Sequence, residues 1–379
     1  MNNGTRPRSS YFKQLDALRG IAALTIVFNH LSILTPLHWV WNTPLRFLLT
    51  GHDAVILFFI ISGFVLTLQL TSRRGPTFSQ YLIKRICRIY LPYVVVLVFT
   101  YGVISVVFHG PVPWAGGWAN SAWDGSFSKD DVVSHVTFIG KYHADHVIPV
   151  IWTLIYEMRI SLFFPLVVYV AARAQPRGSL AMAMLISAGA YVLLVTRNGE
   201  PANANLRVDW TLTAHYAAIF IVGAVLAIHR ARWQAWLSSR GRKMAVLAVS
   251  LALYFMSRAI PGIAPNGVGD FLFDWGCAAG AAGILCTSIA SSRITSLLEL
   301  KPVMYLGSLS YSLYLTHTVV LLSIIHLMPS ADTAWVALAL AAALVIPVAA
   351  VTYHLIERPS MILGKALTER STRGAAPTS

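Results

Sequence analysis

Apolar residues along the chain gather into runs of roughly twenty, separated by short polar segments. An α-helix needs about twenty apolar residues to cross a hydrocarbon core roughly 30 Å thick. The runs lack the regular alternation that marks the strands of a membrane barrel. They predict an all-α fold, a polytopic membrane helix bundle of about ten transmembrane helices. The expected spans are 15–34, 53–71, 89–109, 150–172, 179–196, 211–229, 243–260, 271–290, 302–327 and 332–356.

The composition agrees with a membrane protein, because charged residues make up 12% of the chain and apolar residues 56%. A soluble globular protein carries about 25% charged residues. The net charge of +14 could indicate a nucleic-acid partner. The basic residues cluster in alternate loops instead, so we expect a lipid bilayer around the chain and no nucleic-acid partner.

The distribution of basic residues also orients the chain. When the N-terminus is placed in the cytoplasm, the cytoplasmic segments hold 21 Lys and Arg residues and the opposite side holds six. We therefore expect a cytoplasmic segment 1–14, a transmembrane domain 15–356 and a cytoplasmic tail 357–379 without regular structure. The first apolar run is expected to remain as a span, because about 20 residues is too long for the apolar region of a signal peptide and no convincing cleavage site follows.

The longest loop on the outer side of the membrane, 110–149, contains three tryptophans. Tryptophan favours the membrane interface, so we expect this loop to re-enter the membrane or to lie along its surface. The loop also contains His143, Asp145 and His146, which resemble metal ligands. Three candidates within four residues are weak evidence for a metal, and we expect no metal site.

The first apolar run contains two ionisable residues, Arg19 and His30, eleven positions apart. This spacing places both on one helix face, ~17 Å apart along the axis, with Arg19 near the cytoplasmic mouth. An ionisable side chain within the membrane is costly and therefore favours a functional role. The alternative for His30 is a histidine that packs against a neighbouring helix.

The fourth run contains Glu157, which we expect ~10 Å below the outer surface, at a depth close to that of His30. A carboxylate there could hold the imidazole in its useful tautomer and stabilise the imidazolium. Arg159 lies about 200° further around the helix and is a poor partner for Glu157. The alternative is a structural ion pair between Glu157 and some basic residue.

The ninth run carries polar residues that could bind a substrate. Ser310, Tyr314 and His317 share one helix face, and Tyr311 lies beside them. They could line a substrate channel, or they could join neighbouring helices by hydrogen bonds.

Arg85 and Arg88 lie one helical turn apart at the cytoplasmic start of the third run. Two arginines that project together could cradle phosphate groups. Positive-inside topology alone also accounts for basic residues at this position.

These residues fall in motifs that resemble those of the bacterial acyltransferase-3 family of membrane acyltransferases. The matching motifs are Asp16-Ala-Leu-Arg19-Gly20 followed by His30, Phe58-Phe59-Ile-Ile-Ser62-Gly63-Phe64, Arg85-x-x-Arg88, Trp152-Thr153-Leu154-x-x-Glu157, Leu306-Gly307-x-x-Ser310-Tyr311-x-x-Tyr314-x-x-His317 and Ile356-Glu357-Arg358-Pro359. The resemblance runs in order from about Tyr11 to Pro359, and the ordered set is specific. At Thr153 the family more often has serine, and threonine keeps the hydroxyl.

The resemblance implies transfer of an acyl group, usually acetyl, from cytoplasmic acyl-CoA to a hydroxyl of a glycan. The acceptor would be an exopolysaccharide or a lipid-linked saccharide, and the membrane a bacterial inner membrane. The family's arginine–histidine pair corresponds to Arg19 and His30, and its paired arginines correspond to Arg85 and Arg88. We expect these arginines to bind the acyl-CoA donor.

For the chemistry, we expect His30 to act as general base or to carry the acyl group for a time, with Glu157 orienting it. The alternative function is a proton-coupled transporter of a small polar solute. Such a transporter would use His30, Glu157 and His317 as a proton relay.

Overall fold

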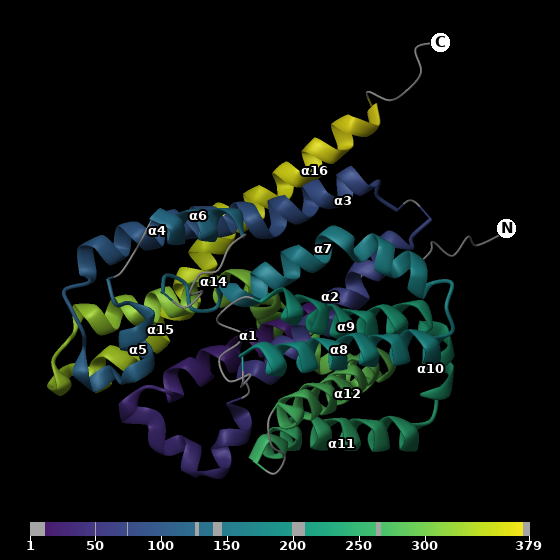
Figure 1. Ribbon diagram of the computed structural model, residues 1–379, viewed down its shortest axis with the longest axis horizontal. Coiled ribbons are helices and arrows are strands. Elements are labelled where there is room, and N and C mark those ends of the chain that lie inside the picture. Colours follow the sequence, from purple (N-terminus) through teal and green to yellow (C-terminus); the bar gives the residue numbers. More distant parts are fainter. Residues whose placement is uncertain are drawn as a thin grey trace.

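The protein is a bundle of helices (Figure 1), seen in a computed structural model that describes residues 12–49, 51–73, 75–125, 129–138, 146–198, 209–262 and 267–373. These residues contain no strand. Nine helices in them are long and apolar enough to cross a membrane, or ten when the bent pair Lys13–Ser32 and Thr35–Asn42 counts as one span. The predicted all-α, multi-pass membrane bundle is therefore confirmed.

The helical segments of the described residues follow one another in this order along the chain. The first half contains α1 (Lys13–Ser32), η1 (Thr35–Asn42), η2 (Pro44–Leu48), α2 (Gly51–Leu70), α3 (Phe78–Arg85), η3 (Ile86–Tyr90), α4 (Leu91–Val107), η4 (Pro113–Ala115), α5 (Gly117–Ala122), α6 (Lys129–Thr137), α7 (Ile151–Ala171) and α8 (Pro176–Asn198). The second half contains α9 (Trp210–Ile228), α10 (Arg230–Trp236), α11 (Arg240–Met256), η6 (Ser257–Gly262), α12 (Val268–Ala290), α13 (Ser292–Leu298), α14 (Lys301–Leu327), η7 (Ala331–Thr333), α15 (Ala334–Thr352), η8 (Tyr353–Glu357) and α16 (Arg358–Arg373).

Lysines and arginines gather at one end of the bundle, which we call the basic end. Lys13, Lys84, Arg240 and Lys301 lie at the helix termini there. In Figure 1, α10 and α16 reach this end on the right, whereas η1, η2 and α5 lie at the opposite end. Both α1 and α14 start at the basic end and run toward the opposite end.

Two pairs of closely packed helices form the centre of the bundle. A Cβ atom on Gly20 of α1 would lie 2.5 Å from the backbone nitrogen of Gly307 in α14. The backbones of α2 and α9 approach in the same way at Gly63 and Gly223. Small residues permit such close approach and strengthen helix packing within a membrane. These contacts fix the positions of α1, α2 and α14, which carry candidate site residues.

Two π-helical segments interrupt the α-helical geometry, η3 between α3 and α4 and η8 between α15 and α16. Such segments are rare and occur often at functional sites. Arg88 lies within η3, and Glu357 is the last residue of η8. Both side chains line one cavity at the basic end.

The long loop between α4 and α7 folds back along the bundle, as the sequence predicts. Its helix α6 lies alongside α4 in Figure 1. The Tyr90 hydroxyl donates a hydrogen bond to the carbonyl oxygen of Val136 at 2.6 Å, and the Tyr93 hydroxyl donates to that of His135 at 3.0 Å. Because Tyr90 belongs to η3, close to the basic end, the loop re-enters the bundle deeply.

The tail beyond Glu357 is not without regular structure, because it forms α16 as far as Arg373. Ser360, Gly364 and Thr368 lie at spacings of four residues, and this row of small residues lets α16 pack on α3 and η3. Gln80 Nε2 in α3 donates a hydrogen bond to the carbonyl oxygen of Thr368 at 3.3 Å. The expectation was wrong because this row of small residues was not interpreted as a packing face.

Candidate active site

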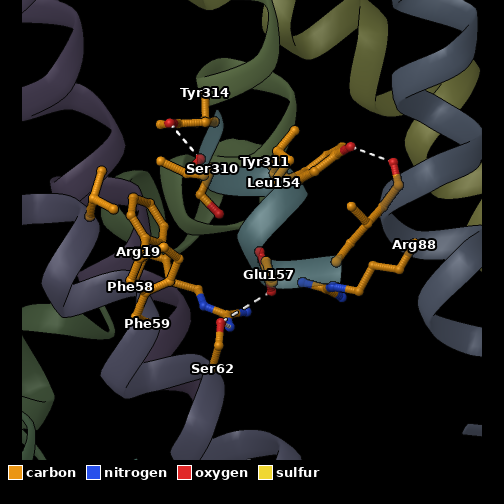
Figure 2. A pocket seen from close by; sticks show the side chains of 13 residues that line it. Arg19, Phe58, Phe59, Ser62, Arg88, Leu154, Glu157, Ser310, Tyr311 and Tyr314 are labelled. Carbon is orange, nitrogen blue, oxygen red and sulfur yellow. Dashed lines mark hydrogen bonds between the residues drawn. The ribbon is translucent and has the colours of Figure 1, made fainter. Parts of the chain in front are cut away.

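Four helical segments contribute to a chain of polar contacts near the centre of the bundle, and Figure 2 shows three of its members, Arg19, Ser62 and Glu157. Arg85 Nη2 donates to Glu157 Oε1 at 2.7 Å, and Ser62 Oγ donates to the same oxygen at 3.3 Å. Arg19 Nη2 in turn donates to Ser62 Oγ at 3.0 Å. Glu157 in α7 therefore joins α1, α2 and the end of α3.

Glu157 does not orient His30, contrary to our expectation. The hydrogen bonds that the structure shows to its carboxylate come from Arg85 and Ser62. The two residues differ in level, because Glu157 meets the network of Arg19, eleven residues from His30 on α1. The structural ion pair, which was the alternative, is the arrangement observed. Arg159 takes no part in it and donates instead to the carbonyl oxygen of Phe138 at 3.0 Å.

Two cavities meet at this network. The deeper one, about 60 Å³, is lined by side chains of α1, α2, η3, α7 and α14, and Figure 2 shows Arg88 directed across it toward Glu157. The larger one, about 580 Å³, lies at the basic end. Arg19 and Arg88 line both cavities. A molecule bound in the larger cavity can therefore contact both arginines beside the deeper pocket.

The two arginines expected to act together have different surroundings. Arg85 is buried, with Nη2 donating to Glu157 and Nε donating to Ser161 Oγ at 3.0 Å. Arg88 Nη1 donates to the Met361 sulfur at 3.4 Å, which is a weak acceptor. Both side chains line the larger cavity. Arg88 retains more capacity to bind an anion, because Arg85 is already paired with a carboxylate.

His30 lies against a second histidine rather than a carboxylate. His317 Nε2 is 3.1 Å from His30 Nδ1, and their ring centroids are 5.0 Å apart. His317 Nδ1 lies 2.7 Å from the carbonyl oxygen of Tyr314, so this nitrogen carries a hydrogen. In the neutral ring, Nε2 of His317 is then an acceptor.

The same reasoning fixes the tautomer of His30. Its Nδ1 faces two acceptors, His317 Nε2 and the carbonyl oxygen of Ile26 at 3.0 Å, so Nδ1 carries the hydrogen. The Nε2 atom of neutral His30 therefore holds the lone pair. The indole ring of Trp118, from the long outer loop, lies 5.1 Å from the imidazole. This arrangement presents one basic nitrogen from a ring whose orientation is fixed.

The polar residues of α14 divide into two groups. Ser310, Tyr311 and Tyr314 line the deeper pocket. The Tyr314 hydroxyl lies 2.7 Å from Thr153 Oγ1, and the Tyr311 hydroxyl donates to the carbonyl oxygen of Ile89 at 2.6 Å. His317 does not line this pocket but contacts His30. Since the Tyr314 and His317 rings are 6.0 Å apart, the histidine pair lies next to the pocket.

Comparison with known protein families identifies the chain. The model of an acyltransferase domain matches residues 12–354. The chain belongs to the acyltransferase-3 family. The expected resemblance is therefore confirmed, and all the motifs that carry it, except the last one, Ile356-Glu357-Arg358-Pro359, lie within the matched region.

Two relatives within this family have names that specify an acceptor. The chain is 23% identical over 372 residues to YrhL of Bacillus subtilis, provisionally named a peptidoglycan O-acetyltransferase, covering 92% of this chain and 55% of that protein. It is 22% identical over 334 residues to the peptidoglycan O-acetyltransferase OatA of Listeria monocytogenes, covering 84% of this chain and 50% of that protein. The chain thus spans about half the length of these relatives. No solved structure matches it.

Two residues of this candidate site, Ser62 and Glu357, escaped the sequence analysis. Ser62 bridges Arg19 and Glu157, and Glu357 accepts a hydrogen bond from Ser312 Oγ at 2.6 Å while lining the larger cavity. Both lie in the motifs of the family, which was the available signal. Within the part of the chain that the structure describes, no group of three or more His, Cys, Asp or Glu residues is arranged to hold a metal. His143 and Asp145 lie outside that part.

Proposed function

We propose that the protein is a membrane O-acyltransferase that moves an acyl group from acyl-CoA to a hydroxyl of a glycan. The acyl group that we propose is acetyl. The observation that carries the proposal is the pair of adjoining cavities that share Arg19 and Arg88, with the two histidines next to the deeper cavity, where the Tyr314 and His317 rings are 6.0 Å apart. The names of the two relatives, both O-acetyltransferases of a glycan, favour the same reaction.

The larger cavity suits the donor. It opens at the basic end, which the positive-inside rule assigns to the cytoplasm, where acyl-CoA is found. Its lining contains five cationic side chains, of Arg19, Lys84, Arg85, Arg88 and Lys365, against three carboxylates. Guanidinium and ammonium groups bind phosphates well, because they combine charge with several hydrogen-bond donors. The donor's phosphates would lie there, with its thioester directed toward the deeper pocket.

His30 would perform the proton transfer. The acceptor hydroxyl oxygen attacks the thioester carbonyl carbon, so that a C–O bond forms and the C–S bond breaks. His30 Nε2 takes the hydroxyl proton and returns it to the departing thiolate, which leaves as CoA thiol. If the acyl group instead passes through His30, the same Nε2 lone pair attacks the thioester first. In both routes His317 Nε2 and the carbonyl oxygen of Ile26 hold His30 in the required tautomer.

The alternative function, a proton-coupled transporter, would need a proton relay through His30, Glu157 and His317, and Glu157 does not contact the two histidines. Glu157 is bound to Arg85 and Ser62, away from the histidine pair. Its carboxylate would have to leave a buried arginine to accept a proton from His30, which is costly. No other observation favours transport, so acyl transfer is the function that the geometry supports best.

The test uses the full chain in lipid nanodiscs. Equilibrium binding of radiolabelled acetyl-CoA is measured first, and then label transfer to a muramidase digest of peptidoglycan. We expect saturable acetyl-CoA binding and base-labile label on the saccharide. Proton-driven uptake of a polar solute into vesicles without acyl-CoA, combined with no acetyl-CoA binding, would instead establish the transporter.

A further inference from the structure

A second buried polar cluster lies at the end of the bundle opposite to the basic end, outside the two cavities. At its centre is Asp274 of α12, whose side chain is only 2% exposed. Asp274 Oδ1 lies 2.6 Å from His52 Nε2 in α2, and Oδ2 lies 2.9 Å from His215 Nε2 in α9. The Tyr191 hydroxyl of α8 donates to Oδ2 at 3.1 Å. Side chains from α2, α8 and α9 thus contact one carboxylate of α12.

The partners of this carboxylate determine where the hydrogens of the cluster lie. The Trp275 indole donates to Ser187 Oγ at 2.9 Å, and Ser187 Oγ lies 2.7 Å from His215 Nδ1. An ionised Asp274 is an acceptor only, so both His215 Nε2 and His52 Nε2 carry hydrogens and donate to it. The neutral His52 ring therefore has its lone pair on Nδ1. The buried members of the cluster thus orient the imidazole of His52.

His52 is the member of the cluster that remains accessible, with 24% of its side chain exposed. It lies three residues before Val55 on α2, and Val55, Phe59 and Ser62 line the deeper pocket. At helical spacing these positions form one face, which His52 extends by a turn toward the opposite end. The pocket face of α2 thus continues to an oriented imidazole at the end where a glycan outside the cell would arrive.

Flat aromatic surfaces flank this imidazole. The Trp152 ring is nearly parallel to His52, at 13° and 6.3 Å between centroids, and the Phe273 ring lies 5.5 Å away. Trp152 immediately precedes Thr153, which lines the deeper pocket. An aromatic surface beside an oriented hydrogen-bond acceptor suits a sugar, which offers both apolar C–H faces and hydroxyl donors.

We propose that His52, oriented by Asp274 and flanked by Trp152, forms a saccharide-binding subsite for the acceptor glycan. In this subsite, Nδ1 of His52 accepts a hydrogen bond from a sugar hydroxyl and positions the chain so that another hydroxyl reaches the deeper pocket. The inference rests on the proposed acyl transfer and adds the location of the acceptor. His52 holds the acceptor and takes no part in bond making.

The discriminating variant is His52→Gln. The glutamine amide can reach Asp274 Oδ1 with its own N–H, so it keeps the interhelical hydrogen bond but lacks the acceptor at the position of Nδ1. His38→Gln is the matched control, because His38 is an exposed histidine in η1 at the same end of the bundle. Three quantities are measured at matched expression: base-released acetate from envelope glycans of a complemented deletion strain, acetyl-CoA affinity in nanodiscs, and the detergent melting temperature.

We expect His52→Gln to lower glycan-bound acetate roughly tenfold, as the loss of one substrate hydrogen bond and its orientation implies. Acetyl-CoA affinity and melting temperature should match those of wild type and of His38→Gln. Wild-type glycan acetylation in His52→Gln would overturn the subsite, and so would a parallel fall in melting temperature and acetyl-CoA affinity. Failure of the wild-type protein both to bind acetyl-CoA and to acetylate glycans would instead refute the proposed function itself.

Discussion

Replacement of Glu157 by glutamine tests the ion pair that joins α7 to the end of α3. The side chains of Arg85 and Glu157 are 7% and 19% exposed, and 2.7 Å separates Arg85 Nη2 from Glu157 Oε1. Removal of one partner of a buried pair costs roughly 3–5 kcal/mol, because the other charge is left buried and uncompensated. The glutamine oxygen still accepts a hydrogen bond from Arg85, which retains about 1 kcal/mol. We therefore expect Glu157→Gln to lower the free energy of unfolding by about 2–4 kcal/mol.

The assay is a double-mutant cycle with Arg85→Gln, followed by reversible denaturation in mixed detergent micelles. If the two charges stabilise each other, the double variant loses less stability than the sum of the single variants, by about 1–3 kcal/mol. Glu369→Gln is the control, because Glu369 pairs with Lys365 at 3.8 Å on an exposed surface, with side chains 65% and 74% exposed. A surface pair of this kind contributes little to stability. Additive losses within about 0.5 kcal/mol would refute the ion pair as a stabilising contact.

Further substitutions at His30, Arg88, Arg85 and His317 probe the chemistry. His30→Ala should reduce acetyl incorporation by membranes roughly 10²–10⁴-fold without lowering the melting temperature, and activity above about a tenth of wild type would exclude a general base there. Arg88→Ala should raise the KM for acetyl-CoA ~10-fold or more, and Arg88→Lys should recover part of this loss. Arg85→Ala should mainly lower the melting temperature. Equal KM values in Arg88→Ala and wild type would show that Arg88 does not bind the donor. His317→Phe should lower kcat with an unchanged KM for acetyl-CoA, because His30 Nδ1 loses one of its two acceptors and the ring loses the contact that positions it. A normal kcat would contradict that positioning role.

Local sequence patterns predicted the features that depend on one helix at a time. Span lengths follow from the length of each apolar run, because every backbone polar group in the bilayer must be satisfied within its own helix. The common face of Ser310 and Tyr314 follows from the helical period, and both line the deeper pocket. The small residues that pack α16 against α3 also form a local pattern, although the tail after Glu357 was expected to lack structure.

Contacts between distant helices lay beyond such patterns. The depth of Glu157, counted along its own helix, gave no information about which basic residue lies opposite, and Arg85 proved to be the partner. His52 and Asp274 are 222 residues apart, and neither belongs to a local motif that would link them. The pairing of His30 with His317, 287 residues away, likewise depends on the packing of α1 against α14. Tertiary packing determines these partners, and local patterns in a single sequence do not reveal how distant helices pack.

The glycine contact between α1 and α14 also determines that the two histidines lie at the same level along these helices. Gly20 precedes His30 by ten residues, and Gly307 precedes His317 by ten residues, in two helices that run in the same direction. Ten residues is the interval from an a position to the d position of the next heptad in a parallel coiled coil, so both layers meet in register. Insertion of one residue into either interval would rotate its histidine by about 100° and shift it by ~1.5 Å. The equal spacing therefore couples the lengths of two segments that lie nearly 290 residues apart, and it limits which insertions the chain can accept.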